Sequence, residues 1–264
     1  MTRWALLIEY DGTGTIGWQS QASGEALQDR LEAAAAKLVG DRVVSLIAGR
    51  TDAGVHATGQ VGAMDLPDRF DARTVQEAIN YFLRPLPLVI RLAVPVDPAW
   101  HPRFDATGRR YRYTILNRRA RPGLERHVWH VSRDLDERLM QAAADRLIGR
   151  HDFTSFRAAA CQAKSPWRTL DVLTVEREGE KVHVRAEARS FLHHQVRNLV
   201  GTLKLVGEGR WTPDRVTAAL EARDRAAAGP TAPPDGLTLT GVAYPLDPFS
   251  PAAPDRSPAA LSPH

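Results

Sequence analysis

The sequence has a single cysteine, and this scarcity already narrows the kinds of protein it can encode. With only Cys161 among 264 residues, the chain can form neither an internal disulfide nor a cysteine-rich metal site. Long apolar runs are missing as well, since no stretch approaches the roughly 20 residues that a membrane-spanning helix needs. The N-terminus, residues 1–4, leads directly into a strand-like pattern and shows no signal peptide. These absences favour a cytoplasmic protein that does not insert into membranes.

What is present is an ordinary globular composition with an unusual concentration of arginine. Hydrophobic residues make up 43% of the chain and charged residues 25%, and the length suffices for one large domain or two packed halves. The net charge is only +4, yet residues 102–126 hold eight arginines against two acidic residues. These arginines are Arg103, Arg109, Arg110, Arg112, Arg118, Arg119, Arg121 and Arg126. Aromatic residues between them suit phosphates and stacked bases, although a solvated surface strand explains the composition equally well.

Residue periodicity predicts six elements in the first part of the chain. One helix is marked by apolar residues at helical spacing, namely Leu27, Leu31, Ala34, Ala35 and Leu38, and ends at Gly40. Asp71 is the predicted N-cap of a second helix, whose inward residues are Val75, Ile79, Phe82 and Leu83. The predicted strands are residues 4–10, 43–48, 60–66 and 88–96. The order is therefore strand, helix, strand, strand, helix, strand.

The second part of the chain repeats this order. Residues 109–117 are a predicted strand, and Asp134 is the predicted cap of a helix with Leu135, Leu139, Ala142, Ala143 and Leu147 inward. A hairpin of residues 167–177 and 181–189 comes next. It is followed by a helix with Leu192, Val196, Leu199, Val200 and Leu203 on one side, then by a short helix that opens at Thr212. Residues 237–244 form the closing strand.

Two copies of this β-α-β-β-α-β order predict an α+β protein built from two ferredoxin-like halves. The halves are expected to form an extended antiparallel sheet, with helices on one face and the active-site cleft on the other. A sheet of this kind is a common platform for RNA. We expect the halves to span residues 1–104 and 105–246, and the tail of residues 247–264, rich in proline and alanine, to be disordered.

Several patterns resemble known sites without meeting their requirements. Residues 12–17 match G-x-G-x-x-G, but no helical pattern begins within that loop, as a dinucleotide site requires. His193 and His194 have no second cluster at metal-binding spacing. Cys161 lacks a histidine nearby in the sequence. We therefore predict no nucleotide cofactor and no metal.

The most suggestive stretch for chemistry is the loop of residues 48–56, A-G-R-T-D-A-G-V-H. Gly49 and Gly54 flank Asp52, so the backbone can bend and present the carboxylate. An Asx-turn in a hairpin would account for the same residues. A carboxylate beside Arg50 is expected to be ionised and oriented, which suits a nucleophile. On an RNA-binding fold its target would be a flipped nucleotide, which an aromatic residue such as Tyr111 could hold.

Basic residues beyond this loop are candidates for contacts with the RNA backbone. Arg109 and Arg110 lie in the arginine-rich strand. His193, Arg197 and Lys204 are spaced four and seven residues apart, so that they could share one helix face. The solvent side of an amphipathic helix would give the same pattern.

Five stretches together resemble the tRNA pseudouridine synthase A family. They are Y-D-G-T-G with G-W-Q (residues 10–19), the run of residues 48–61, R-F-D-A-T with R-R-Y-R-Y (residues 103–113), D-F-T-S-F-R (residues 152–157) and F-L-H-H-Q-V-R-N (residues 191–198). They occur in the family's order, and the resemblance extends over about residues 3–245. Thr15, Ile16 and residues 81–87 depart from the usual pattern, but none of these departures includes Asp52.

The resemblance implies an isomerase that converts uridine to pseudouridine in tRNA. Asp52 would be the catalytic nucleophile, Tyr111 would contact the substrate base, and Arg50 and Arg197 would lie beside the carboxylate. The usual substrate is the anticodon stem-loop, at about positions 38 to 40 in tRNA numbering. The family acts without metal or organic cofactor and as a homodimer. Attack of the aspartate on C1′ of the sugar or on C6 of the uracil remains open.

An alternative is a non-catalytic RNA-binding protein with paired ferredoxin-like domains. It would explain the arginines but not the R-T-D-A-G loop.

Overall fold

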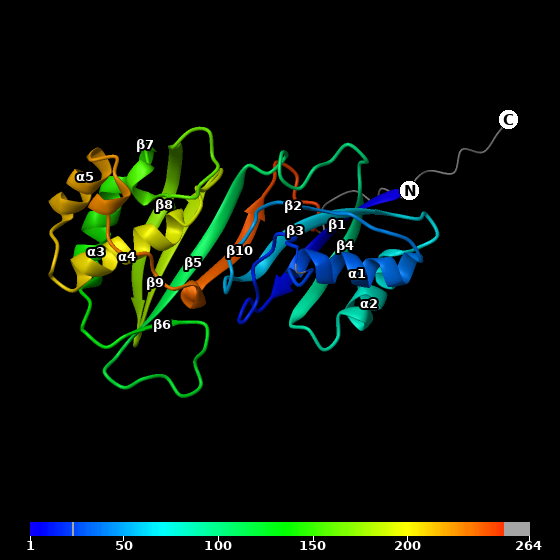
Figure 1. Cartoon of the computed structure of the whole chain (residues 1–264), viewed down its shortest axis with the longest axis horizontal. Helices are drawn as coiled ribbons and strands as arrows, with labels where there is room; N and C mark the ends of the chain where they lie inside the picture. The colour runs from blue at the N-terminus through cyan, green and yellow to red at the C-terminus, as the bar shows by residue number, and fades with distance from the viewer. Residues whose placement is uncertain (23, 251–264) are drawn as a thin grey trace.

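The computed structural model describes residues 1–22 and 24–250 and contains one large sheet with helices packed against it (Figure 1). The first half comprises β1 (Thr2–Tyr10), α1 (Leu27–Val39), β2 (Ser45–Ile47), β3 (His56–Leu66), α2 (Ala72–Leu83) and β4 (Leu88–Val96). The second comprises β5 (Gly108–Asn117), β6 (Trp129–Val131), α3 (Glu137–Ala144), β7 (Gly149–Asp152), β8 (Trp167–Glu178), β9 (Lys181–Ala188), α4 (Gln195–Gly207), α5 (Pro213–Glu221) and β10 (Leu237–Ala243). Short 3-10 turns are η1 (Asp145–Leu147), η2 (Thr154–Phe156), η3 (Arg225–Ala227) and η4 (Pro234–Gly236).

The sheet topology confirms the two ferredoxin-like halves. The strand order is β4-β1-β3-β10-β5-β9-β8-β7, with β2 paired to β3 and β6 paired to β5. In each half the last strand of the β-α-β-β-α-β unit lies beside the first, so the halves share one arrangement. β10 joins them, because it pairs antiparallel with β5 and parallel with β3. The end of the second half thereby closes one continuous, mostly antiparallel sheet.

Capping residues explain most helix starts. Asp71 caps α2 as predicted, its carboxylate accepting a hydrogen bond of 2.7 Å from the Thr74 backbone N–H. Thr212 caps α5, also as predicted. The prediction for α3 was wrong by two residues, since Asp136 rather than Asp134 caps it. Of the five residues predicted to face inward, Leu135, Ala143 and Leu147 are buried. Leu139 is 41% exposed and Ala142 faces solvent, and Met140 is buried instead.

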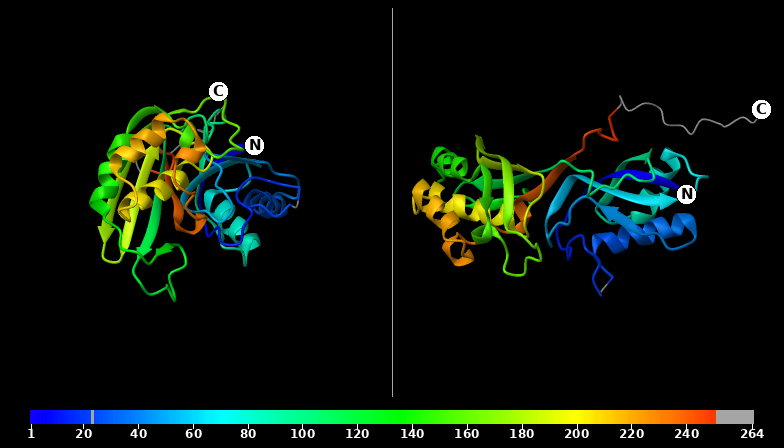
Figure 2. Two further views of the ribbon diagram at one scale, coloured as in Figure 1. Left: turned by 60° about the vertical axis from the view of Figure 1, so that its left-hand side comes forward. Right: turned by 90° about the horizontal axis from the view of Figure 1, so that it is seen from above.

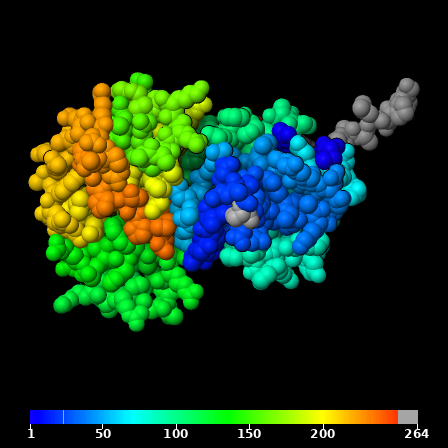
Figure 3. Space-filling model, in the orientation of Figure 1, coloured from blue at the N-terminus to red at the C-terminus, as the bar shows by residue number. Residues whose placement is uncertain are grey.

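Two hydrophobic cores lie under the helices, one in each half. α1 and α2 cover the first half, and α3, α4 and α5 cover the second (Figure 2). Tyr111 packs against both cores, at the place where the halves meet. In the space-filling view the two halves lie side by side along the long axis (Figure 3).

Side-chain alternation shows which face of the sheet carries the cleft. Tyr10, Ala57, Leu239 and Tyr111 are paired in turn across β1, β3, β10 and β5, so their side chains lie on one face. That is the helix-bearing face, because Tyr10 and Tyr113 belong to the cores under the helices. The cleft that contains Tyr111 and Asp52 therefore opens between the two groups of helices. The expectation that it would lie on the face without helices was wrong in this detail.

Within the described ranges, none of the helices has the length and apolar character needed to cross a bilayer. Most of the tail for which we predicted disorder, residues 251–264, lies outside the described residues.

Candidate active site

The loop that carries Asp52 is held at several points along its backbone. Tyr10 and Thr51 share a hydrogen bond of 2.7 Å between their hydroxyls, and the Trp18 N–H donates to the Thr51 carbonyl at 3.1 Å. The Gln60 side-chain amide, fully buried, donates to the Gly49 carbonyl at 2.7 Å. Because these anchors come from three separate segments, the loop has a fixed position relative to the sheet.

Glycines allow two loops to lie against each other here. A Cβ on Gly12 would come within 2.1 Å of the Val55 carbonyl oxygen, and Gly17, with φ of +98°, lies against the backbone of residues 51–53. The G-x-G-x-x-G match is thus a packing motif, and α1 begins only at Leu27. Gly54 has φ of +78°, as a sharp bend requires. Gly49 does not adopt the left-handed conformation, so the prediction that both glycines permit the bend holds for Gly54 alone.

The Asp52 carboxylate is surrounded by three basic side chains that precede or begin α4. Its Oδ1 lies 3.3 Å from Nε2 of His193, and its Oδ2 lies 3.4 Å from Nε2 of His194. Arg197 donates from a terminal guanidinium nitrogen to Oδ2 at 3.3 Å. The predicted pairing of Asp52 with Arg197 is therefore present, and His193 contacts the carboxylate directly.

The start of α4 is shaped to bring these groups to Asp52. His194, the N-cap residue, has φ of 61°, a left-handed conformation that costs a non-glycine residue about 1–2 kcal/mol. Nε of Arg197 donates to the Ala232 carbonyl at 2.7 Å, and the Ala232 N–H donates back to the Arg197 carbonyl at 3.1 Å. Burial lowers the pKa of His194, while the nearby Asp52 charge acts in the opposite sense. The sequence analysis assigned no role to His194. The only signal in the sequence that could have indicated one is its position next to His193.

Tyr111 lies in the same cleft as Asp52. Its ring meets that of Phe191 edge-on, with centroids 5.2 Å apart and planes at 87°. Burial raises the pKa of the Tyr111 phenol well above its usual value, and the charge of Asp52 adds to that effect. The phenol, which is protonated at neutral pH even in water, is thus a still weaker acid here.

The cleft around these residues is large and basic. It has a volume of about 1500 Å³, larger than the roughly 300–1000 Å³ typical of small-molecule pockets. The arginines that line it are Arg50, Arg103, Arg109, Arg168, Arg189 and Arg197. Arg50 is exposed and, within the described part of the chain, Asp52 forms its ion pairs with residues other than Arg50. The role of Arg50 beside the carboxylate therefore stays a prediction, and its charge is available for a polyanion.

The arginine-rich strand is divided between the two faces of the sheet, because successive side chains of a strand alternate. Arg109 is buried, and its guanidinium donates to the carbonyls of Arg189 at 2.6 Å, Ala48 at 2.8 Å and Arg103 at 2.9 Å. Arg110 is exposed on the opposite face and pairs with Glu187 at 3.4 Å. Arg109 therefore joins the base of the Asp52 loop to two other segments, a structural role instead of the predicted contact with RNA backbone.

Replacing Arg109 by methionine is expected to lower the free energy of unfolding by about 3 kcal/mol, because buried carbonyls would lose charged donors. Arg110→Met is the matched control, and a change within about 0.5 kcal/mol is expected for it. Urea denaturation followed by circular dichroism measures both. Equal stability of the two variants would contradict the structural role of Arg109.

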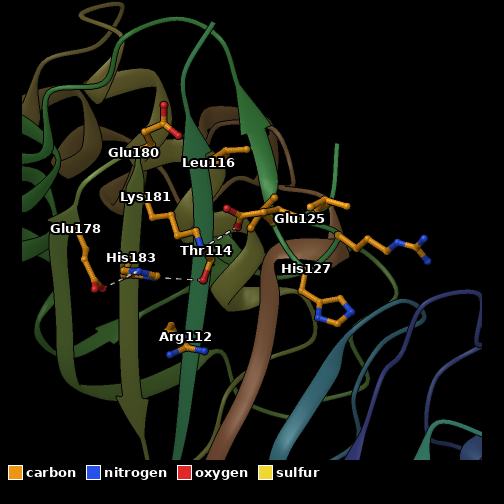
Figure 4. Close-up of a pocket in the computed structure, with 12 residues that line it drawn as sticks. Arg112, Thr114, Leu116, Glu125, His127, Glu178, Glu180, Lys181 and His183 are labelled. Carbon is orange, nitrogen blue, oxygen red and sulfur yellow. Dashed lines mark hydrogen bonds and ion pairs between the residues drawn. The ribbon is translucent and has the colours of Figure 1, made fainter. Parts of the chain in front are cut away.

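A second hollow of about 750 Å³ lies on the opposite face of β5 and β9 (Figure 4). Two pairs of oppositely charged or titratable groups lie in it: Lys181 is 2.8 Å from Glu125, and His183 is 3.6 Å from Glu178. Arg112 also lines this hollow and so lies away from Asp52. The predicted RNA contact Lys204 is likewise remote from the cleft, since it pairs with Glu208 at 2.7 Å and lies over the ring of Trp129.

Among the described residues, two groups of side chains bring possible metal ligands within 4.8 Å of one another, although their spacing in the sequence did not reveal them. One is Asp52 with His193 and His194, where the fixed charge of Arg197 at the same carboxylate opposes a cation. The other is Asp11 with His56 and His127. There Nδ1 of His56 accepts a hydrogen bond from the Gly12 N–H, and His127 lies 3.0 Å from the carboxylate. Hydrogen bonds and ion pairs account for both groups, and the prediction that the protein uses no metal stays a prediction.

Known proteins resemble this chain over nearly its whole length. A family model for tRNA pseudouridine synthase matches residues 143–245. A tRNA pseudouridine synthase A of Acidiphilium cryptum is 62% identical over 252 residues, which cover 94% of this chain and 99% of that protein. The relatives of the same name from Gluconobacter oxydans (57% identical, covering 95% and 92%) and Paramagnetospirillum magneticum (56%, covering 92% and 96%) are similar.

Among solved structures, a chain of a Cbf5-Nop10-Gar1 complex overlaps 77% of this chain and 45% of its own length. Its TM-score of 0.34 and identity of 14% are too low to support any argument. The sequence relatives decide the family. With 54–62% identity to relatives of one name over at least 92% of its length, the chain belongs to the tRNA pseudouridine synthase A family of isomerases, which convert uridine to pseudouridine.

Proposed function

We propose that this enzyme isomerises uridine in the anticodon stem-loop of tRNA, at about positions 38 to 40, with Asp52 as the nucleophile. The observation that carries the proposal is a carboxylate on an anchored loop, contacted by Arg197 and two histidines inside a basic cleft. A carboxylate held in this way can form a temporary covalent bond without first being moved.

The reaction matches the groups that surround Asp52. The N1–C1′ bond of uridine breaks, the uracil turns, and a C5–C1′ bond replaces the one lost. A bond from Asp52 to C1′ or to C6 keeps the detached pieces together during the turn. Tyr111 and Phe191 offer aromatic surfaces in the same cleft against which the flipped base can rest. The isomerisation needs neither an oxidant or reductant nor a donor of a chemical group.

An RNA stem-loop suits the cleft on charge and on size. The exposed guanidinium of Arg50 and those of Arg103 and Arg189 line the cleft, where they can bind phosphates near the target base. Asp52 comes from the first half, and Arg197 and Tyr111 come from the second. We therefore propose that the chain divides into two halves between residues 104 and 105, and that catalysis requires both.

The homodimer and the cytoplasmic location expected from the resemblance also belong to this proposal. The edge strand β4 supports a dimer, because it exposes the apolar side chains of Val89 (43%) and Leu92 (42%). A cytoplasmic location fits a tRNA substrate.

The choice of substrate position can be tested with unmodified tRNA transcripts. We expect pseudouridine only at positions 38 to 40 when uridine occupies them, mapped by carbodiimide block of primer extension. Transcripts with cytidine at those positions are the matched controls and should stay unmodified. Pseudouridine formed at equal rate elsewhere in the tRNA would refute the anticodon assignment while leaving the activity intact.

A further inference from the structure

Pseudouridine formation requires two proton movements in addition to the change of glycosidic bond. N1 is bonded to C1′ in uridine but carries a hydrogen in pseudouridine, whereas C5 carries a hydrogen in uridine and is bonded to C1′ in the product. One proton must therefore reach N1 and one must leave C5, whichever atom Asp52 attacks. Because the two movements cancel, one acid–base group that gives a proton and later takes one would serve the whole reaction.

The groups that contact or neighbour Asp52 differ in their fitness for this task. Tyr111 is not ionised near neutral pH, since a phenol is a weak acid even in water, and burial raises its pKa further. The guanidinium of Arg197 does not release its proton in proteins and is hydrogen-bonded to the Ala232 carbonyl. The imidazoles of His193 and His194 are the remaining neighbours of the carboxylate, and imidazole exchanges protons readily near neutral pH.

The two imidazoles form a coupled pair. Their ring centroids lie 4.1 Å apart with an angle of 45° between the planes, and each ring reaches a different oxygen of Asp52. Two imidazolium charges at this separation would repel each other, so a proton on one ring disfavours a second proton on the other. The positive charges of Arg197 on α4 and Arg225 on η3 disfavour a proton on His194. The cleft is also lined by the titratable or charged groups Cys161, Arg168 and Arg189.

The backbone of His194 gives independent support. Together with Arg223, it is one of two non-glycine residues with positive φ in the described part of the chain. Glycine or asparagine would adopt this conformation more easily. A strained backbone that keeps an imidazole 3.4 Å from the reactive carboxylate indicates that the side chain itself is used.

We propose that His193 and His194 act as one acid–base pair, which protonates N1 of the detached uracil and then removes the proton from C5. This inference rests on the proposed role of Asp52. When the N1–C1′ bond breaks, its electron pair stays on N1, which takes the proton of the imidazolium. After C5 has bonded to C1′, the C5–H bond breaks, its electrons restore the C5–C6 double bond, and the neutral imidazole takes the proton. Any bond from Asp52 breaks with its electrons returning to the carboxylate.

The charge of Asp52 coordinates these transfers. While Asp52 is a free carboxylate, it stabilises a proton on the pair by Coulombic attraction at 3.3–3.4 Å. Once Asp52 is bonded to the substrate its charge is gone, and the pair gives up the proton more easily. Release of Asp52 restores the attraction at the moment when the C5 proton has to be taken.

Four variants test the pair in single-turnover assays on an unmodified tRNA transcript. His193→Gln and His194→Asn remove one imidazole each, and the double variant removes both; asparagine tolerates the left-handed backbone. His194→Gly relaxes that backbone and leaves space for free imidazole. We expect the double variant to be slower by about 10²–10⁴-fold with tRNA affinity unchanged. The wild-type rate should be bell-shaped between about pH 5 and 8, and both limbs should be lost in the double variant.

Two further measurements separate acid–base chemistry from a structural role. Added imidazole should restore the rate of His194→Gly about tenfold or more. Uridine with deuterium at C5 should slow the double variant more than the wild type, because C5–H cleavage becomes rate-limiting. His151→Gln, a histidine on β7 outside the cleft, is the control and should match the wild type in every assay.

The outcomes distinguish this inference from the proposed function. A double variant with the wild-type rate and pH profile would overturn the acid–base pair while leaving Asp52 as nucleophile. A slow double variant with an unchanged pH profile, no imidazole rescue and no added isotope effect would also overturn it. A wild-type protein that forms no pseudouridine would instead refute the proposed function itself.

Discussion

Replacing Asp52 by asparagine is expected to abolish pseudouridine formation, with the single-turnover rate falling by at least about four orders of magnitude. Asparagine has the shape of aspartate but no nucleophilic oxygen, and it can still accept the hydrogen bond from Arg197 that Oδ2 accepts now. The affinity for tRNA should therefore stay within a few-fold of the wild type. Filter binding with labelled tRNA measures the affinity, and release of tritium from C5 of uridine measures the chemistry.

Two companion variants make this result specific to the position of the carboxylate. Asp52→Glu keeps the charge but moves it by one methylene, for which we expect a loss of about 10²-fold. Asp68→Asn alters an exposed aspartate that binds the N-terminus, and it should be fully active. A rate for Asp52→Asn within tenfold of the wild type would rule out Asp52 as nucleophile.

The sequence predicted those parts of the fold that depend on neighbouring residues. Asp71 was recognised as a cap because its contact with the Thr74 N–H spans only three residues. The start of α3 was misplaced because Asp134 and Asp136 are equally suitable caps on local grounds. A tertiary contact decides between them, since the Asp136 N–H donates to the Gly207 carbonyl at the end of α4 at 2.9 Å. The place of β10 between β3 and β5 is non-local in the same way.

The candidate site was predictable to a similar extent. The glycine-flanked loop identified Asp52, but its partners lie far along the chain, Arg197 being 145 residues away. Spacing of four and seven residues suggested one helix face for His193, Arg197 and Lys204. His193 actually precedes α4, which begins at Gln195, so helical spacing does not apply to it. In the structure Lys204 pairs with Glu208, whereas His193 and Arg197 contact Asp52.

Burial explains why the arginine-rich strand was misread. Charge counting treats Arg109 and Arg110 alike, whereas the strand sends them to opposite faces of the sheet. Arg109 satisfies backbone carbonyls in the interior, and Arg110 stays in solvent beside Glu187. The basic surface of the cleft is instead assembled from Arg50, Arg103 and Arg189, on three different loops.

Removing Arg197 is expected to have the second-largest effect on activity. Arg197→Ala should slow catalysis by about 10²–10³-fold, because the carboxylate loses a fixed hydrogen-bond donor. Arg197→Lys should recover little of this loss. An ammonium group carries the charge but cannot contact the Ala232 carbonyl and Asp52 with the same planar geometry. Single-turnover rates and urea denaturation measure both variants, and Arg110→Ala, on the opposite face, is the control.

A double-mutant cycle between Arg197 and Asp52 shows whether the guanidinium acts through the carboxylate. If it does, adding Arg197→Ala to Asp52→Asn should change the remaining rate by less than about threefold, because residues that act as a unit are strongly non-additive.

The effects of the two substitutions on the free energy of unfolding should also be non-additive. Arg197→Ala alone leaves Asp52 without its guanidinium partner in a partly buried site, and Asp52→Asn removes that uncompensated charge. The double variant should therefore be more stable than Arg197→Ala. Additive effects on both quantities would mean that Arg197 serves mainly to hold the Ala232 segment, and that the ion pair with Asp52 is incidental to catalysis.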